Sequence, residues 1–199
     1  MGDKHTPWAL VNEAELASVE ELESQSDRGV AIMGGAFVEE RVRQAILHRL
    51  RPLSKTMRDR LFNGDRPLSS FSAKIDLGFA LGLYGPVTRA DLDRVRRVRN
   101  IFAHSLAPCD FSRADIEDLV TKICLPERIK KVEGDPHYSY KIIGPIPLEP
   151  KPRMILSIKL FLAYLYSESV STIHPNPTKY GQPPNPMWLK WLCTITNRS

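Results

Sequence analysis

Two segments of this chain carry apolar side chains on nearly every side of a helix, and they constrain the fold most. Residues 30–38 contain no charged side chain, and residues 71–84 contain only two, Lys74 and Asp76. A helix that is apolar all round has to be buried. We therefore expect both segments inside a helical bundle. Gly34-Gly35 would weaken an exposed helix by about 1 kcal/mol per glycine, so the pair indicates that a neighbouring helix approaches closely there.

Start and stop residues divide the first two thirds of the chain into helices. Ser26 or Asp27 is the expected N-cap of a long helix that begins there. Further along the chain, Gly85-Pro86 ends the helix expected over residues 71–84. The expected helices cover residues 8–25, 27–50, 54–62 and 71–84, followed by two that open with capping-box-like starts at Thr88-x-x-Asp91 and Ser112-x-x-Asp115. Because the connections are short, we expect an all-α fold, an antiparallel up-and-down helical bundle.

The C-terminal third has a different composition. Five prolines fall within residues 131–152, which are typical of a linker or an irregular strap. Residues 154–166 are almost wholly apolar but too few to span a bilayer, so they are either a buried helix or one half of a dimer contact. A proline-rich tail then precedes an aromatic anchor, Trp188 and Trp191. We therefore predict a bundle over residues 1–130, a linker over 131–152, and a C-terminal helix with an aromatic tail over 153–199.

Composition and the known motifs exclude several classes of function. The three cysteines are widely spaced and form no C-x-x-C pair, so neither a disulfide framework nor a zinc site is expected. The N-terminus has no apolar core of a signal peptide, and we expect a cytoplasmic protein that does not enter the membrane. There is no G-x-x-x-x-G-K-[ST], G-x-G-x-x-G, H-E-x-x-H or G-x-S-x-G. We therefore expect no metal and no cofactor.

One arginine lies where a solvated charge is not expected. On a helix over residues 94–105, Arg99 falls within the apolar stripe of its neighbours: Leu92, Val95, Val98 and Phe102. A buried guanidinium needs a carboxylate, a phosphate or a partner chain. Glu39, on the apolar stripe of the helix over 27–50, is the preferred carboxylate, and Asp76 is the second choice. The alternative is that these ions only fix the register of the bundle.

The segment Arg99-Asn100-x-x-x-His104 resembles the R-x4-6-H motif of the HEPN superfamily, which includes metal-independent ribonucleases and non-catalytic RNA binders. Together with residues 26–32, 67–83 and 91–105, it is similar to the mannitol operon repressor (MltR) family over about residues 15–125. The resemblance implies a regulatory protein. For the catalytic members it implies a homodimer in which the two motifs face each other, with Arg99 and His104 as the catalytic pair and with Asn100, Glu39 and Asp76 supporting them.

The chemistry of these side chains fits RNA cleavage without a metal. Arginine can neutralise phosphate oxygens, and histidine can move a proton near neutral pH. His104 is five residues from Arg99, about 140° around a helix, so the helix must end near His104 or the two groups must meet through a second chain.

The competing hypothesis is a transcriptional or RNA-level repressor. No helix-turn-helix with an exposed reading helix is evident, so we expect it to act through RNA or a partner protein. The net charge is +5, and basic residues gather at Arg94, Arg96 and Arg97, which are the expected nucleic-acid contacts. A solvated helix face is the simpler reading of that cluster.

Overall fold

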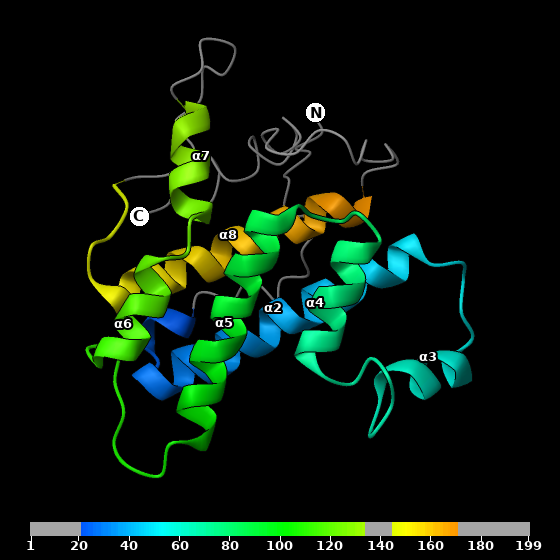
Figure 1. The fold of residues 1–199 in the computed structure, drawn as a ribbon, viewed down its shortest axis with the longest axis horizontal. Helices are drawn as coiled ribbons and strands as arrows, with labels where there is room; N and C mark the ends of the chain where they lie inside the picture. The colour runs from blue at the N-terminus through cyan, green and yellow to red at the C-terminus, as the bar shows by residue number, and fades with distance from the viewer. Residues whose placement is uncertain (1–20, 134–144, 171–199) are drawn as a thin grey trace, which may run out of the picture.

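The computed structural model describes residues 21–133 and 145–170, and within these residues the chain is helical without a strand (Figure 1). The elements, in order, are η2 (Leu22–Ser24), α2 (Asp27–Arg49), α3 (Lys55–Phe62), α4 (Phe71–Ala80), α5 (Pro86–His104), α6 (Ala114–Thr121), α7 (Leu125–Glu133) and α8 (Pro150–Val170). The all-α prediction is therefore confirmed. Most of the helix predicted over residues 8–25, and the anchor at Trp188 and Trp191, lie outside the described residues.

α2 is the centre of the bundle. Its N-cap is Ser26, whose hydroxyl oxygen accepts a hydrogen bond from the amide of Gly29. The close approach predicted at Gly34-Gly35 is confirmed on two sides, because Gly34 faces Ile158 of α8 and Gly35 faces Arg99 of α5. A side chain at either position would meet these neighbours, so the two glycines let α8 and α5 pack closely on two different sides of α2.

α2 and α8 run parallel, which corrects the antiparallel prediction for this pair. The start of α8 meets the start of α2, where the Lys151 ammonium lies 3.1 Å from an Asp27 carboxylate oxygen. Further along, Ile158 meets Gly34. Figure 1 shows both helices running in the same direction behind α4 and α5. The prediction rested on short connections between neighbours in sequence, and α8 follows α2 only after five other helices.

Two pairs of helices that are neighbours in sequence, α4 with α5 and α5 with α6, pack antiparallel, as predicted. The Arg89 guanidinium near the start of α5 contacts Asp76 of α4 at 2.6 Å. The end of α5 meets the segment before α6, where the rings of Phe102 and Phe111 lie 5.0 Å apart. α4, α5 and α6 thus form a layer across the α2 and α8 pair (Figure 1).

α8 is a buried helix, which decides between the two alternatives for residues 154–166. It begins at Pro150, inside the segment predicted as a linker, and packs chiefly on α2. Its buried side chains join one core with those of α2 and α5, and they include Ile158, Leu160, Phe161 and Leu165. Among the described residues, no helix is long and apolar enough to cross a membrane.

Two predicted helix starts and one predicted end are wrong. α5 begins at Pro86 with Gly85 as N-cap, so Thr88 is inside the helix and does not cap it. Proline at the first helical position has a backbone angle suited to a helix, which moves the start upstream. α6 has no side-chain cap, since the Ser112 hydroxyl donates to Asp110 instead. α4 ends at Ala80, and Gly82, whose φ is +70°, turns the chain toward α5.

Candidate functional site

A carboxylate between two cations is the centre of the predicted site. Oε1 of Glu39 on α2 lies 2.6 Å from Nζ of Lys74 on α4, and Oε2 of Glu39 lies 3.5 Å from Nη1 of Arg99 on α5. Lys74 also donates to the carbonyl oxygen of Ser69 at 2.9 Å. The preferred ion pair of Glu39 with Arg99 is therefore present, but it is a single 3.5 Å contact and not the bidentate pair that was expected, and Lys74 is the closer partner. The cluster joins three helices and keeps one net positive charge.

The burial of the three side chains differs, and this decides what each can do. The Lys74 side chain is 7% exposed and that of Glu39 is 15% exposed, whereas Arg99 is 32% exposed. Lys74 and Glu39 therefore form a largely desolvated ion pair inside the bundle. Arg99 lies at its rim, less buried than the sequence indicated, with a guanidinium that solvent reaches.

The adjacent residue of α2, Glu40, faces a second arginine. Its two carboxylate oxygens accept from Arg43 at 2.6 and 2.7 Å. Burial acts to raise the pKa of Glu40, but the hydrogen bonds and charge of Arg43, with the nearby Lys74 charge, hold it below its usual value. Glu40 is therefore engaged beside the Glu39 cluster and remains ionised near neutral pH.

Asp76 does not belong to this cluster, which corrects its place as second choice. It is on the exposed side of α4, with a side chain 61% exposed, and its partner is Arg89. Lys74 and Asp76 are two residues apart, which places them about 200° from each other around the helix. The face of α4 that carries Lys74 is therefore buried, and the face that carries Asp76 is exposed to solvent.

His104 is the last residue of α5, so the helix ends after His104 and not between it and Arg99. Because α5 is continuous from Arg99 to His104, the two side chains lie on different sides of one helix. The helix is capped by another residue, since Arg28 of α2 donates to the carbonyl oxygen of Ser105 at 2.8 Å. Among the described residues, the exposed imidazole of His104 forms no hydrogen bond or ion pair.

Asn100 and Arg97 share the outer face of α5 with His104, because residues three, four and seven apart fall on one side of a helix. The three arginines of the predicted basic cluster differ in whether a carboxylate neutralises them. Arg94 binds the buried Asp91, and Arg96 binds Asp93, in each case one turn before it. Within the part of the chain that the structure describes, Arg97 is exposed and has no ion pair. Of the three predicted contacts, Arg97 is thus the one whose charge faces solvent unopposed.

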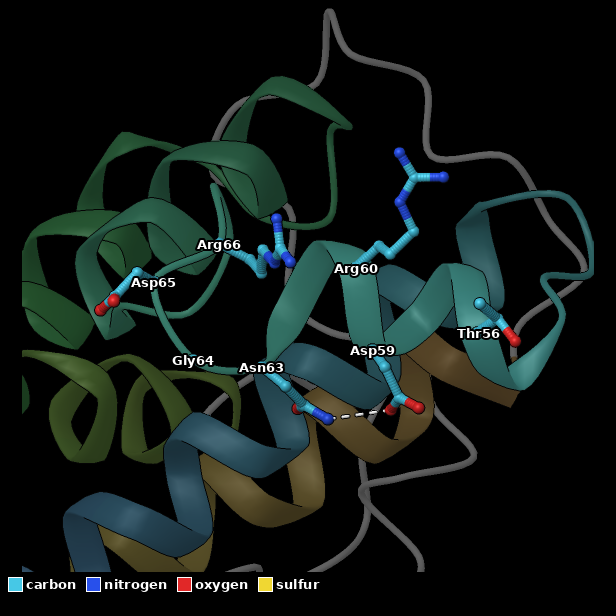
Figure 2. Close-up of a pocket in the computed structure, with 7 residues that line it drawn as sticks. All are labelled: Thr56, Asp59, Arg60, Asn63, Gly64, Asp65 and Arg66. Atoms are coloured by element: carbon cyan, nitrogen blue, oxygen red, sulfur yellow. Dashed lines mark hydrogen bonds between the residues drawn. The ribbon is translucent and has the colours of Figure 1, made fainter.

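A second group of cations was missed by the sequence reasoning, around α3. Residues lining an open hollow of about 700 Å³ beside this helix are Thr56, Asp59, Arg60, Asn63, Gly64, Asp65 and Arg66 (Figure 2). In Figure 2, Arg60 and Arg66 point to one side of α3, while Asn63 and Asp59 are hydrogen-bonded on the other. The available signal was five cations against two acids within residues 51–66.

No family model, no curated protein and no solved structure matches this chain. Among the described residues, no three side chains of His, Cys, Asp or Glu are grouped so that they could hold a metal ion.

Proposed function

We propose that the chain is a regulatory protein of the MltR-like, HEPN-type class, and that it acts by binding RNA without cleaving it. The observation that carries this proposal is the contact between Glu39 and Arg99. In a single chain the arginine of the R-x4-H motif is engaged by a carboxylate that also holds Lys74, and the histidine lies on another side of α5. A catalytic pair needs both groups within reach of one phosphate.

The RNA contact is assigned to the outer face of α5. Arg97 provides an exposed guanidinium that can bind a phosphate, and Asn100 and His104 add hydrogen-bonding groups to the same face. Arg96 is tied to Asp93 by a half-exposed pair one turn away on the same helix, which can be exchanged for a phosphate. Contacts of this type bind the backbone and carry little sequence information.

The proposal is tested by measuring the anisotropy of a labelled mixed-sequence RNA in EDTA at several salt concentrations. Arg97→Gln is compared with Arg113→Gln, which removes the same charge from the exposed surface of the segment before α6. We expect Arg97→Gln to weaken RNA binding and to reduce the slope of log Kd against log salt concentration by about 1. Arg113→Gln should change neither the affinity nor the slope. Equal effects of the two variants would overturn the assignment to α5.

A metal-independent endoribonuclease is the second candidate, and His104 favours it. The imidazole is exposed, and the task of capping α5 falls to Arg28. A histidine without a structural partner is available for proton transfer. Cleavage would require a homodimer that brings His104 of one copy to Arg99 of another.

The same RNA separates the two candidates. Fragments with 2',3'-cyclic phosphate ends, produced in EDTA by the wild type but not by His104→Ala, would establish the nuclease. Binding without cleavage, with His104→Ala folded as the wild type is, supports the RNA-binding regulator. Sedimentation of both proteins at the same concentration shows whether the dimer that the nuclease requires is present.

A further inference from the structure

The arm formed by residues 51–66, which contains α3, has an unusual charge arrangement. Five of its side chains are exposed cations: Arg51, Lys55, Arg58, Arg60 and Arg66. None of the five forms an ion pair with any residue that the structure describes. Of the two acids in the arm, Asp59 accepts a hydrogen bond from Asn63 at 2.8 Å. The arm therefore presents an unneutralised positive surface.

Three exposed cations in the rest of the bundle are arranged differently, although Arg97 is, among the described residues, unpaired like those of the arm. Arg89, Arg113 and Lys122 each lie within 2.8 Å of a carboxylate on their own or a neighbouring helix. Such pairing neutralises the local field at little cost in free energy. Two acids, Asp59 and Asp65, are close by in the sequence of the arm as well, yet none of its five cations pairs with them. Five like charges held on sixteen residues repel each other and leave a site for an anion.

The arm stands apart from the layers of the bundle but is fixed to it. Figure 1 shows α3 at one edge of the molecule, connected by loops on both sides. Its one buried side chain is Phe62, over which the Arg43 guanidinium lies 5.9 Å from the ring centre. Behind it, the amide of Leu68 donates to the carbonyl of Leu61 at 2.9 Å, which closes the turn that carries Arg66. The cations thus project from an anchored element.

The hollow beside α3 is lined by two arginines that can bind a phosphate backbone and by two acids, Asp65 and Asp59, of which Asp59 accepts a hydrogen bond from Asn63. The Arg60 and Arg66 guanidinium groups come from the helix and from the turn, and both point to the same side (Figure 2). The Thr56 hydroxyl lines the same hollow. Guanidinium groups bind phosphate oxygens in pairs of parallel hydrogen bonds, and hydroxyl groups add neutral donors.

We propose that this arm binds the phosphodiester backbone of a nucleic acid, with Arg60 and Arg66 as the central contacts. The proposal deepens the RNA-binding function. That the nucleic acid is RNA rests on the proposed function, whereas the cations of the arm would bind the phosphodiester backbone of either RNA or DNA. An anionic membrane fits less well, because a membrane-binding helix also needs an apolar face turned outward. On α3, Phe62 is buried and Leu61 is half-buried, so Met57, 41% exposed, is its one large apolar side chain in solvent.

The test compares two double variants that remove the same charge. Arg60→Gln with Arg66→Gln changes the arm, and Arg113→Gln with Lys122→Gln changes the exposed surface around α6. Labelled mixed-sequence RNA and duplex DNA are titrated with full-length protein at several salt concentrations. We expect the arm variant to weaken binding roughly tenfold and to reduce the slope of log Kd against log salt by about 1.5, and the control to leave the slope unchanged.

Each remaining outcome has one meaning. Equal losses in the two double variants would show that only total charge matters and would overturn the arm as a site. A loss in Arg97→Gln alone would overturn the arm but keep the proposed function. Binding of DNA without RNA, lost in the arm variant, would keep the arm and overturn the RNA-level function. Absence of binding to either nucleic acid overturns the arm, and binding to phosphatidylserine vesicles in that case identifies a membrane as its partner.

Discussion

Gly35 on α2 lies directly against the side-chain stem of Arg99 on α5. A Cβ at Gly35 would come within 2.9 Å of the Arg99 Cβ and 3.1 Å of its Cδ. Glu39 follows Gly35 by one helical turn, so the stem passes over the glycine and its guanidinium reaches the carboxylate. The glycine thus sets the distance between two helices and the direction of the arginine.

Replacing Gly35 by alanine therefore has two opposed effects. Alanine favours a helix by up to about 1 kcal/mol over glycine, but the added methyl group overpacks the contact by about 1–3 kcal/mol. We expect the free energy of unfolding to fall by about 1 kcal/mol in urea denaturation. In an Arg99→Gly background the loss should be smaller, because Cβ, Cγ and Cδ of the stem are all gone. An equal loss in both backgrounds would contradict the packing explanation.

The ion cluster leads to a prediction for Glu39→Gln. This change leaves the Lys74 ammonium, whose side chain is 7% exposed, with the Ser69 carbonyl but without a carboxylate. Removing one partner of a buried pair costs about 3 kcal/mol. Asp76→Asn is the matched control on α4, since its pair with Arg89 is exposed and should cost less than about 0.5 kcal/mol. Similar losses for the two variants would show that Lys74 finds another partner.

Much of this arrangement could be predicted from local sequence. Ser26, Ser54 and Ser70 each cap the helix that follows through a side-chain oxygen, and this interaction depends on neighbours only three residues away. The pairing of Glu39 with Arg99 could be predicted too. Each is a charge on an apolar stripe of the sequence and so needs an opposite charge, although Arg99 lies at the rim of the core and the closer partner of Glu39, Lys74, was not predicted.

What could not be predicted depends on contacts between distant segments. The parallel packing of α2 and α8 is decided by which apolar faces fit together, and short-connection rules do not apply across five helices. The unpaired cations of the α3 arm were missed for a related reason. Their number is visible in the sequence, but only the fold shows that Arg60 and Arg66 point away from carboxylates (Figure 2).

Asp91 should make stability depend on pH. It is fully buried on α5, and burial raises its pKa above the usual value, although the amide of Cys124 and the Arg94 charge act against this. The folded state then holds the proton more strongly than the unfolded state does. The contribution of Asp91 to the free energy of unfolding is therefore most favourable below the pKa of an unfolded aspartate, about 3.9, and is lost as the pH rises through the pKa of the folded state.

This dependence can be measured against Asp91→Asn, which cannot titrate. The stability of the wild type relative to the variant, from urea denaturation, should become more favourable as the pH falls from 6.5 to 4. A difference that stays constant, or changes in the other direction, would show that the amide and Arg94 contacts outweigh burial.

Arg153 of α8 closes the end of α6. Its guanidinium is buried and donates to three backbone carbonyls there, those of Val120, Thr121 and Ile123, at 2.9–3.3 Å. Arg153→Met keeps most of the volume but leaves these acceptors without their donor, which we expect to cost about 2–4 kcal/mol. The backbone amides of α6 should also exchange their hydrogens faster in this variant than in the wild type. Lys159→Met, which breaks only the pair with exposed Glu23, should change stability by less than about 0.5 kcal/mol.

The last prediction separates the structural role of the end of α5 from its function. Arg28 donates to the carbonyl oxygen of Ser105, so Arg28→Ala should lower the free energy of unfolding by about 1 kcal/mol. The exposed His104 side chain has no partner among the described residues, so His104→Ala should change it by less than about 0.5 kcal/mol. If His104→Ala proved the more costly change, the histidine would be a structural cap, and both proposed uses of it, in binding and in cleavage, would lose their basis. If Arg28→Ala is the more costly, any effect of His104→Ala on RNA reports on function alone.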